Sequence, residues 1–236
     1  MSFLDEYCTL TDGQVRFTRL QASRFAKQVA DDYNPIHDMQ AKRFCVPGDL
    51  LFAVLLRRQG LHPKMHFTFS GMVGEGVDLH FEETVPGELR LVDAKEKEYL
   101  RATYEGVPHV EETAIEEITR SYVQFSGHNF PHVLGGLMKE HGVMINIDRP
   151  LVIYESMSLD LHRADLHAVT IEPTGATMEV EGKRGNVKLS FRFLEAGTPV
   201  GTGEKRMVLS GLREYDEEGM ASMVAAYEQR KRDGVE

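Results

Sequence analysis

The chain has 236 residues, of which 42% are hydrophobic and 27% are charged, a composition typical of globular domains. Its 37 acidic and 27 basic residues give a formal charge of −10, which argues against a general nucleic-acid binder because such proteins need a basic face. Apolar runs far shorter than about 18 residues exclude a membrane-spanning helix. The start of the chain lacks a secretory signal, and two cysteines are too few for a disulfide framework, so we expect a cytoplasmic protein with reduced thiols.

The first predicted element is a short helix that begins at a capping box. The Thr18 hydroxyl can accept from the Gln21 backbone N–H while the Gln21 side chain reaches back, and apolar residues follow at helical spacing. We expect the helix to end before Pro35, because a residue that precedes proline is pushed out of the α region. A second helix is predicted after Gly48, and its nearly continuous apolar residues indicate burial.

The hydrophobic period then changes to two, which predicts antiparallel strands between residues 65 and 99. The rest of the chain repeats this order. A second capping box is expected at Thr113 and Glu116, an apolar helix around 133–138, and a closing helix near 220–227. Further strands are predicted at 151–161, 169–171, 178–180, 187–193 and 207–209.

The repeated order favours an internal duplication. An offset of 95 residues places Thr18 on Thr113 and His37 on His132. We therefore predict two repeats, 1–106 and 107–236, of which the second includes the closing helix. Each repeat is a two-layer α+β unit, and two units side by side can form one continuous sheet that removes two exposed edges.

The stretch from Asp31 to His37 carries the chemistry that the sequence predicts. Pro35 turns the chain and brings Asp32 close to His37. A carboxylate and an imidazole that share one water can act as an acid–base pair, and the Asn34 amide can orient the loop or the water. Downstream, Gly48 at a helix start offers a backbone N–H to an approaching oxygen.

The spacing Asp32-x-Asn34-Pro35-x-His37 resembles the D-x-N-P-x-H signature of the MaoC-like and (R)-specific enoyl-CoA hydratases, also called hydratase 2. These proteins have the hot-dog fold, in which a sheet wraps a long central helix. The close resemblance covers residues 20–58. It implies an α+β double hot dog, with two antiparallel sheets or one continuous sheet around two buried central helices.

The resemblance also implies an activity. In the family an Asp and a His activate one water, which adds to the β-carbon of a trans-2-enoyl thioester. By this resemblance Asp32 and His37 are the catalytic pair, Asn34 supports them, and the Gly48 N–H binds the thioester oxygen. We expect a hydratase or dehydratase whose small-molecule substrate is a CoA or carrier-bound acyl thioester, with no cofactor and no metal. A homodimer is a further expectation.

Two alternatives remain open at this point. One is a hot-dog acyl-CoA thioesterase, since such enzymes hydrolyse thioesters with a single carboxylate and a helix-start N–H. The other is a non-catalytic protein that binds acyl groups or CoA. It is favoured by Pro47, where the family has His, and by a shorter 38–47 segment. In the second repeat Gly127 replaces the Asp of the motif, which assigns any activity to the first repeat.

Further residues admit two interpretations each. Cys45 is a nucleophile or, as we expect, a buried structural thiol. His128, Asn129 and His132 suggest a metal site or, as we favour, a turn. The basic pairs Lys42-Arg43 and Arg57-Arg58 are expected to be surface charges, with contact to CoA phosphates as the alternative.

Overall fold

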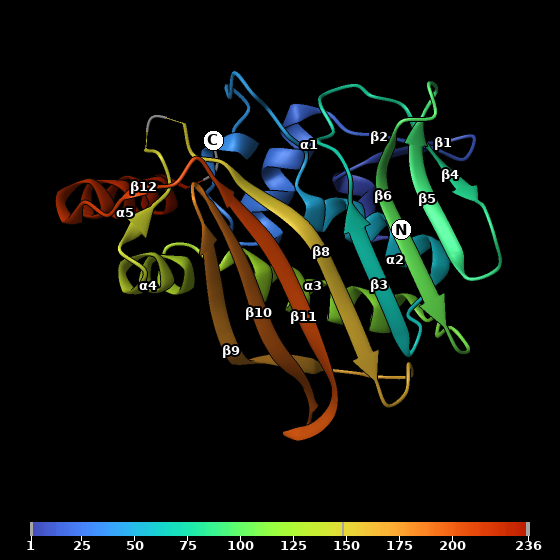
Figure 1. Ribbon diagram of the computed structural model, residues 1–236. Coiled ribbons are helices and arrows are strands. Elements are labelled where there is room, and N and C mark those ends of the chain that lie inside the picture. The colour runs from blue at the N-terminus through green and yellow to red at the C-terminus, as the bar shows by residue number, and fades with distance from the viewer. Residues whose placement is uncertain (1, 148, 235–236) are drawn as a thin grey trace.

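The computed structural model describes residues 2–147 and 149–234 (Figure 1). Its main feature is an antiparallel sheet with the strand order β1-β2-β4-β5-β6-β3-β8-β11-β10-β9. In the middle of this sheet β3 (Lys64–Phe69) pairs with β8 (Val152–Leu161), so strands from both halves of the chain form one continuous sheet. The order β4-β5-β6-β3 on one side is repeated as β9-β10-β11-β8 on the other. The division at residue 106 stays a prediction.

The other strands flank this central pair. On the N-terminal side lie β1 (Thr9–Thr11), β2 (Gln14–Arg16), β4 (Leu79–Glu83), β5 (Glu88–Asp93) and β6 (Glu98–Glu105). On the C-terminal side lie β9 (Val169–Glu181), β10 (Arg184–Glu195) and β11 (Thr198–Ser210). The strands predicted at 169–171 and 178–180 are therefore one strand. A separate small sheet pairs β7 (Val143–Met144) with β12 (Arg213–Glu214).

The helices gather on one face of the large sheet (Figure 1). None of those described is long and apolar enough to cross a membrane. The longer ones are α1 (Arg19–Arg24), α2 (Gly48–Gln59), α3 (Glu112–Gly127), α4 (His132–Glu140) and α5 (Glu217–Asp233). The short turns are η1 (Phe3–Glu6), the π-helical η2 (Phe25–Val29) and η3 (Pro35–His37).

The first predicted capping box is confirmed, and the second is wrong. The Thr18 hydroxyl accepts from the Gln21 N–H, and the Gln21 side chain accepts from the Thr18 N–H. In contrast, α3 has Glu111 as its N-cap, without a capping hydrogen bond, so Thr113 already lies inside the first turn. Just before this point His109 forms an isolated β-bridge with Leu61, and Glu111 itself is extended.

The first helical segment ends before Pro35, as predicted. The α1–η2 segment stops at Val29, well before Pro35. The reason is backbone conformation, because Asp31 adopts a left-handed φ of 54°, which no helix residue can have. The chain therefore leaves the helix before the Asp–Asn–Pro–His loop, and the whole loop is free to form turns of its own.

The main core is built around α2, in which every residue from Asp49 to Leu56 is buried. The Phe52 ring contacts Phe67 of β3 and Tyr122 of α3, both with ring centroids 5.0 Å apart. Burial of each such aromatic side chain contributes about 1.5–3 kcal/mol. The apolar helix expected around 133–138 forms as α4, but it packs with α5 in a second, smaller core, and α3 is the helix that packs against α2.

Candidate active site

The loop from Asp32 to His37 is shaped by two successive side-chain turns. The Asp32 carboxylate accepts the backbone N–H of Asn34 at 2.8 Å, and the Asn34 side-chain oxygen accepts that of Ile36 at 3.2 Å. Such Asx turns need Asp or Asn at each of these positions. Pro35 then begins the short helix η3 with the backbone angle that it already prefers. The result is a tight reversal that returns His37 toward Asp32.

The structure brings Asp32 and His37 together. Asp32 Oδ2 lies 3.6 Å from His37 Nε2, and the His37 residue is only 9% exposed. The His37 Nδ1 lies 2.7 Å from the Cys45 carbonyl oxygen. A carbonyl only accepts, so Nδ1 carries the proton and the neutral ring presents a lone pair at Nε2.

The two facing atoms of this pair are then both acceptors. A separation of 3.6 Å is also too long for a direct hydrogen bond between His37 and Asp32. A molecule with an O–H group, such as water, can donate to both at once. The pair is therefore arranged to bind a proton donor and to take its proton.

Gly48 is the first residue of α2, after Pro47 at the N-cap. The N–H groups of a first helical turn have no partner within the helix. A Cβ at Gly48 would lie 2.9 Å from Tyr154 Cδ1 and 3.2 Å from Phe69 Cε1, and these two rings stack at 4.1 Å. Close packing therefore requires glycine at this position, independently of what its N–H binds.

A buried polar cluster lies beside the pair, and the sequence analysis did not find it. The Ser126 hydroxyl donates to Asp49 Oδ2 at 2.5 Å, and the Lys205 ammonium donates to the Ser126 oxygen. All three residues are at most 7% exposed. Asp49 Oδ1 is buried without a hydrogen-bond partner among the described residues. We call Asp49, Ser126 and Lys205 the buried triad; it joins α2 to α3 and β11.

Two tyrosines enclose the buried triad. The Lys205 ammonium lies 4.2 Å from the ring centroid of Tyr154, a cation–π distance. The Tyr154 hydroxyl in turn hydrogen-bonds the Tyr122 hydroxyl. Since Tyr154 also covers Gly48, the buried triad and the start of α2 share one wall.

Charge couples the buried triad to the pair. Burial raises the pKa of Asp49, an effect that the Lys205 ammonium and the Ser126 hydrogen bond oppose and the Asp32 carboxylate increases. Burial lowers the pKa of Lys205, whereas Asp49 and Asp32 act to raise it. The protonation of Asp49 and Lys205 therefore responds to the charge on Asp32.

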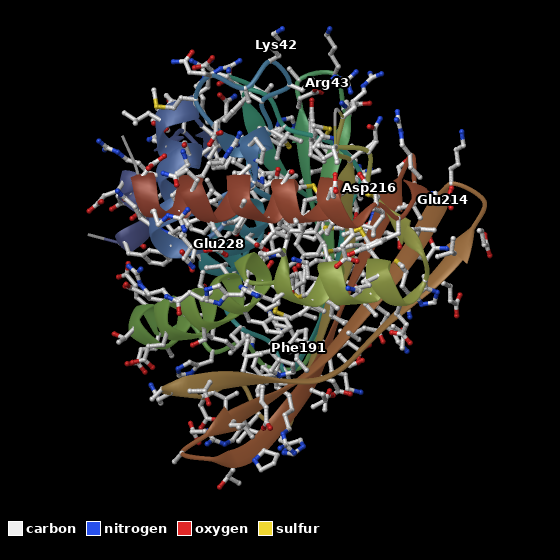
Figure 2. The ribbon with its side chains drawn as sticks, turned by 90° about the vertical axis from the view of Figure 1, so that its left-hand side faces the viewer. Lys42, Arg43, Phe191, Glu214, Asp216 and Glu228 are labelled. Carbon is white, nitrogen blue, oxygen red and sulfur yellow. The ribbon has the colours of Figure 1, made fainter. Side chains whose placement is uncertain are left out.

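Helix α5 contacts the outer side of the loop that holds Asp32 and His37. Figure 2 shows this helix lying across the molecule. The Tyr227 hydroxyl accepts the Tyr33 N–H at 3.4 Å and lies 3.5 Å from the Asp31 carbonyl. Lys231 pairs with the Asp31 carboxylate, and Arg230 lies 3.1 Å from Asp38. Burial raises the pKa of Tyr227, and Asp32 adds to this effect.

The second-repeat loop packs against the first. A Cβ on Gly127 would lie 1.8 Å from the Ala30 carbonyl oxygen, so the residue that replaces the motif Asp must be glycine. His128 Nε2 lies 2.6 Å from the Asp31 carboxylate, and the Asn129 amide donates to the Ser126 carbonyl. These contacts make the second loop a support of the first.

The remaining candidates lie away from the pair or are poorly reactive. Burial raises the pKa of the Cys45 thiol to about 11, so it is protonated near neutral pH and a poor nucleophile. Arg57 pairs with Asp5, and Arg58 lies over the Phe81 ring; both are at the C-terminal end of α2, away from Gly48. Figure 2 shows Lys42 and Arg43 extending outward.

Two surface cavities lie away from this site. One, of about 330 Å³, is lined by residues of β8 to β11. The other, of about 250 Å³, lies between the N-terminal turn and the start of α3. Neither is lined by Asp32, His37 or Gly48.

The family described as "Protein of unknown function (DUF3581)" matches residues 2–218. The chain belongs to this family. Helix α5 begins at Glu217, so nearly all of it lies outside the matched region. A comparison with curated proteins finds no match.

Comparison with solved structures gives information on the fold of the chain. The chain is similar to the tesB protein MAP1729c of Mycobacterium avium subs paratuberculosis, with 9% identity, a TM-score of 0.50, and coverage of 87% of this chain and 97% of that one. A protein of unknown function with the hot dog fold from Alicyclobacillus acidocaldarius has 8% identity, a TM-score of 0.48, and coverage of 89% and 98%. A MaoC-like dehydratase has 9% identity, a TM-score of 0.43, and coverage of 85% and 97%. At such an identity the likeness to the tesB protein shows the fold alone, and with the continuous antiparallel sheet it confirms the expected α+β double hot dog.

Proposed function

We propose that this protein is a hydratase or dehydratase of acyl thioesters, of the MaoC-like type, that uses Asp32 and His37 to activate water. The observation that carries the proposal is the pair itself. The two groups lie 3.6 Å apart, the Nδ1 proton of His37 is held by the Cys45 carbonyl, and two acceptors therefore face one site. The double hot-dog fold and the sequence resemblance support the same reaction class.

The proposed reaction adds the elements of water across a 2-enoyl thioester. The two O–H groups of one water donate to Asp32 and to His37 Nε2. As the water oxygen bonds to the β-carbon, one proton passes to Asp32 and the π electrons of the double bond move to the α-carbon and the thioester oxygen. The pair returns the proton to the α-carbon, so hydrogen and hydroxyl are added and nothing else is consumed.

The developing negative charge needs a donor at the thioester oxygen. The Gly48 N–H at the start of α2 is the proposed donor, helped by the positive end of the helix dipole. Asn34 keeps the loop in its turn through its bond to the Ile36 N–H, and is a positioning residue. The substrate brings its own CoA or carrier, so the reaction needs no cofactor.

The test is hydration of enoyl-CoA substrates with short, medium and long chains by the purified full chain, followed by loss of the enoyl absorbance. Asp32→Asn and His37→Gln are expected to lower kcat/KM by about 100- to 10,000-fold with an unchanged circular dichroism spectrum. Asp12→Asn is the matched control, because Asp12 is an exposed turn residue with φ of 50° that Asn also tolerates. Absence of turnover with every chain length would refute the proposal.

A thioesterase is the second candidate, and Asp49 favours it. This carboxylate is the second residue of α2, beside the proposed N–H donor. Release of CoA from saturated acyl-CoA, detected with a thiol reagent, separates hydrolysis from hydration. Binding of acyl-CoA with neither reaction would favour the non-catalytic alternative.

A further inference from the structure

Three potential metal ligands converge away from the candidate active site. His109 lies in the segment between β6 and α3, Glu111 directly precedes α3, and His167 lies in the connection between β8 and β9. One ligand atom from each, the two imidazole nitrogens and a carboxylate oxygen, lies within 4.8 Å of the others. The cluster thus joins the segment between the two halves to a loop of the second half.

The distances within this cluster are those of a coordination shell rather than of hydrogen bonds. His109 Nε2 lies 3.5 Å and His167 Nε2 lies 3.7 Å from the same oxygen, Glu111 Oε2. Both distances exceed the usual limit for an N–H to oxygen hydrogen bond. With metal–ligand bonds of about 2.0–2.2 Å, the edge of a tetrahedron is about 3.3 Å. The two nitrogen–oxygen distances are within a few tenths of an ångström of that edge, and all three ligand atoms lie within 4.8 Å of one another.

One polar atom of the cluster, His109 Nε2, is buried without a hydrogen-bond partner among the described residues. Such an atom costs roughly 1–3 kcal/mol unless something binds it. Glu111 is the N-cap of α3 but makes no capping hydrogen bond, so its carboxylate is not needed by the helix. The rings of His109 and His167 meet edge to face, with centroids 6.0 Å apart and an interplanar angle of 86°.

The surroundings hold the cluster in place. The Glu195 carboxylate accepts the backbone N–H of His167 at 2.8 Å and pairs with Arg163. Arg163 also lies 3.0 Å from Asp165. The loop is therefore fixed by its own contacts.

We propose that His109, Glu111 and His167 bind one divalent transition-metal ion, with zinc as the best match. Two imidazole nitrogens and one carboxylate suit Zn²⁺, whereas Mg²⁺ and Ca²⁺ take oxygen ligands almost exclusively. Three protein ligands leave a fourth position for water. The bound ion fastens the start of α3 to the β8–β9 loop. The sequence gives no motif for this site, because two ligands lie together and the third is distant in the chain.

The experiment uses the full chain without a histidine tag, after treatment with a chelator. Zn²⁺ is titrated by calorimetry, and Co²⁺ is followed by the visible absorption of its tetrahedral complexes. We expect one ion per chain and no binding of Mg²⁺ under the same conditions. Loss of a ligand is expected to weaken binding by about tenfold or more, the range seen even for residues that only orient ligands.

The variants are chosen so that folding and binding are separable. His167 and Glu111 are about half exposed, so His167→Ala and Glu111→Gln leave the core intact. His162→Ala is the control, since it removes an exposed histidine of the same connection that is outside the cluster. The site is supported if Zn²⁺ and Co²⁺ binding is weakened in His167→Ala and Glu111→Gln and unchanged in His162→Ala. Equal binding in all variants, or no binding by the parent chain, overturns it.

Discussion

The Nδ1–H of His37 donates to the carbonyl oxygen of Cys45 at 2.7 Å. This single contact decides which nitrogen faces Asp32 and that the facing nitrogen is an acceptor when the ring is neutral. The same short segment between His37 and α2 makes a second contact with the loop, because the backbone N–H of Cys45 donates to the Ile36 carbonyl. The segment that is shortened relative to the resembled family thus orients the imidazole.

The buried triad gives a prediction about stability. Lys205→Met removes the positive charge beside Asp49 and leaves a buried carboxylate uncompensated, which is expected to lower the free energy of unfolding by about 3–5 kcal/mol. The double variant Asp49→Asn/Lys205→Met, in which neither charge remains, is expected to recover most of that loss. Urea denaturation of the single and double variants measures both values. Additive losses in the double variant would show that the two charges do not interact.

Two helical glycines provide a test substitution and its matched control. Gly127→Ala places a Cβ 1.8 Å from the Ala30 carbonyl oxygen, so the loop that begins at Ala30 must move. We expect a loss of about 1–3 kcal/mol in unfolding free energy, together with reduced activity of the Asp32 site. Gly135→Ala meets no atom within 4 Å in α4 and is expected to be neutral or to stabilise by up to about 1 kcal/mol. Thermal unfolding distinguishes them, and equal melting temperatures would contradict the packing argument.

Tyr227 gives a prediction about positioning. Tyr227→Phe removes the hydroxyl that joins α5 to Asp31 and Tyr33, at a cost of about 1 kcal/mol in stability. Because the hydroxyl steadies the Asp32 loop without reaching the proposed reacting atoms, kcat is expected to fall severalfold with the pH profile unchanged. Ser222→Ala, an exposed change on the same helix, is the control. A shifted pH profile in Tyr227→Phe would instead indicate a direct part in proton transfer.

Cys8 gives a prediction about pH. Burial raises the pKa of its thiol from 9.0 to about 11, so between these values the folded chain keeps a proton that the unfolded chain has lost. The free energy of unfolding therefore falls as pH rises from 9 to 11, and about 2–3 kcal/mol of this fall belongs to Cys8. In Cys8→Ala that contribution is absent, so the stability difference between parent and variant should shrink over this range. A difference independent of pH, measured by urea unfolding, would refute the assignment.

The structural features that could be predicted from the sequence depend on residues close together in the chain. The Thr18 cap, the turn at Pro35 and the helix start at Gly48 depend on neighbouring residues, and each was found from the sequence. Thr113 offered an equally good local pattern but lies inside α3, which begins at Glu112, three residues after His109 of the distant bridge to Leu61. The local pattern alone did not place the start of that helix.

The buried triad shows how much of the site could be predicted. Lys205 shares the inward face of β11 with Met207 and Leu209. A lysine within this alternating apolar pattern could have been predicted to be buried from the sequence. Its partners Asp49 and Ser126 come from other elements, and no spacing connects them. The Tyr227 contact spans 194 residues of sequence for the same reason, and only the folded chain reveals it.

The pairing of β3 with β8 has a consequence for synthesis on the ribosome. Lys64 pairs with Asp160, so one side of β3 stays unpaired until β8 has been synthesised. At about 5–20 residues per second, this interval lasts on the order of 5–20 s. An unpaired strand side is a template for association with other chains. The nascent first half therefore has to be shielded, by folding helpers or by its own charge, until β8 emerges and closes the sheet.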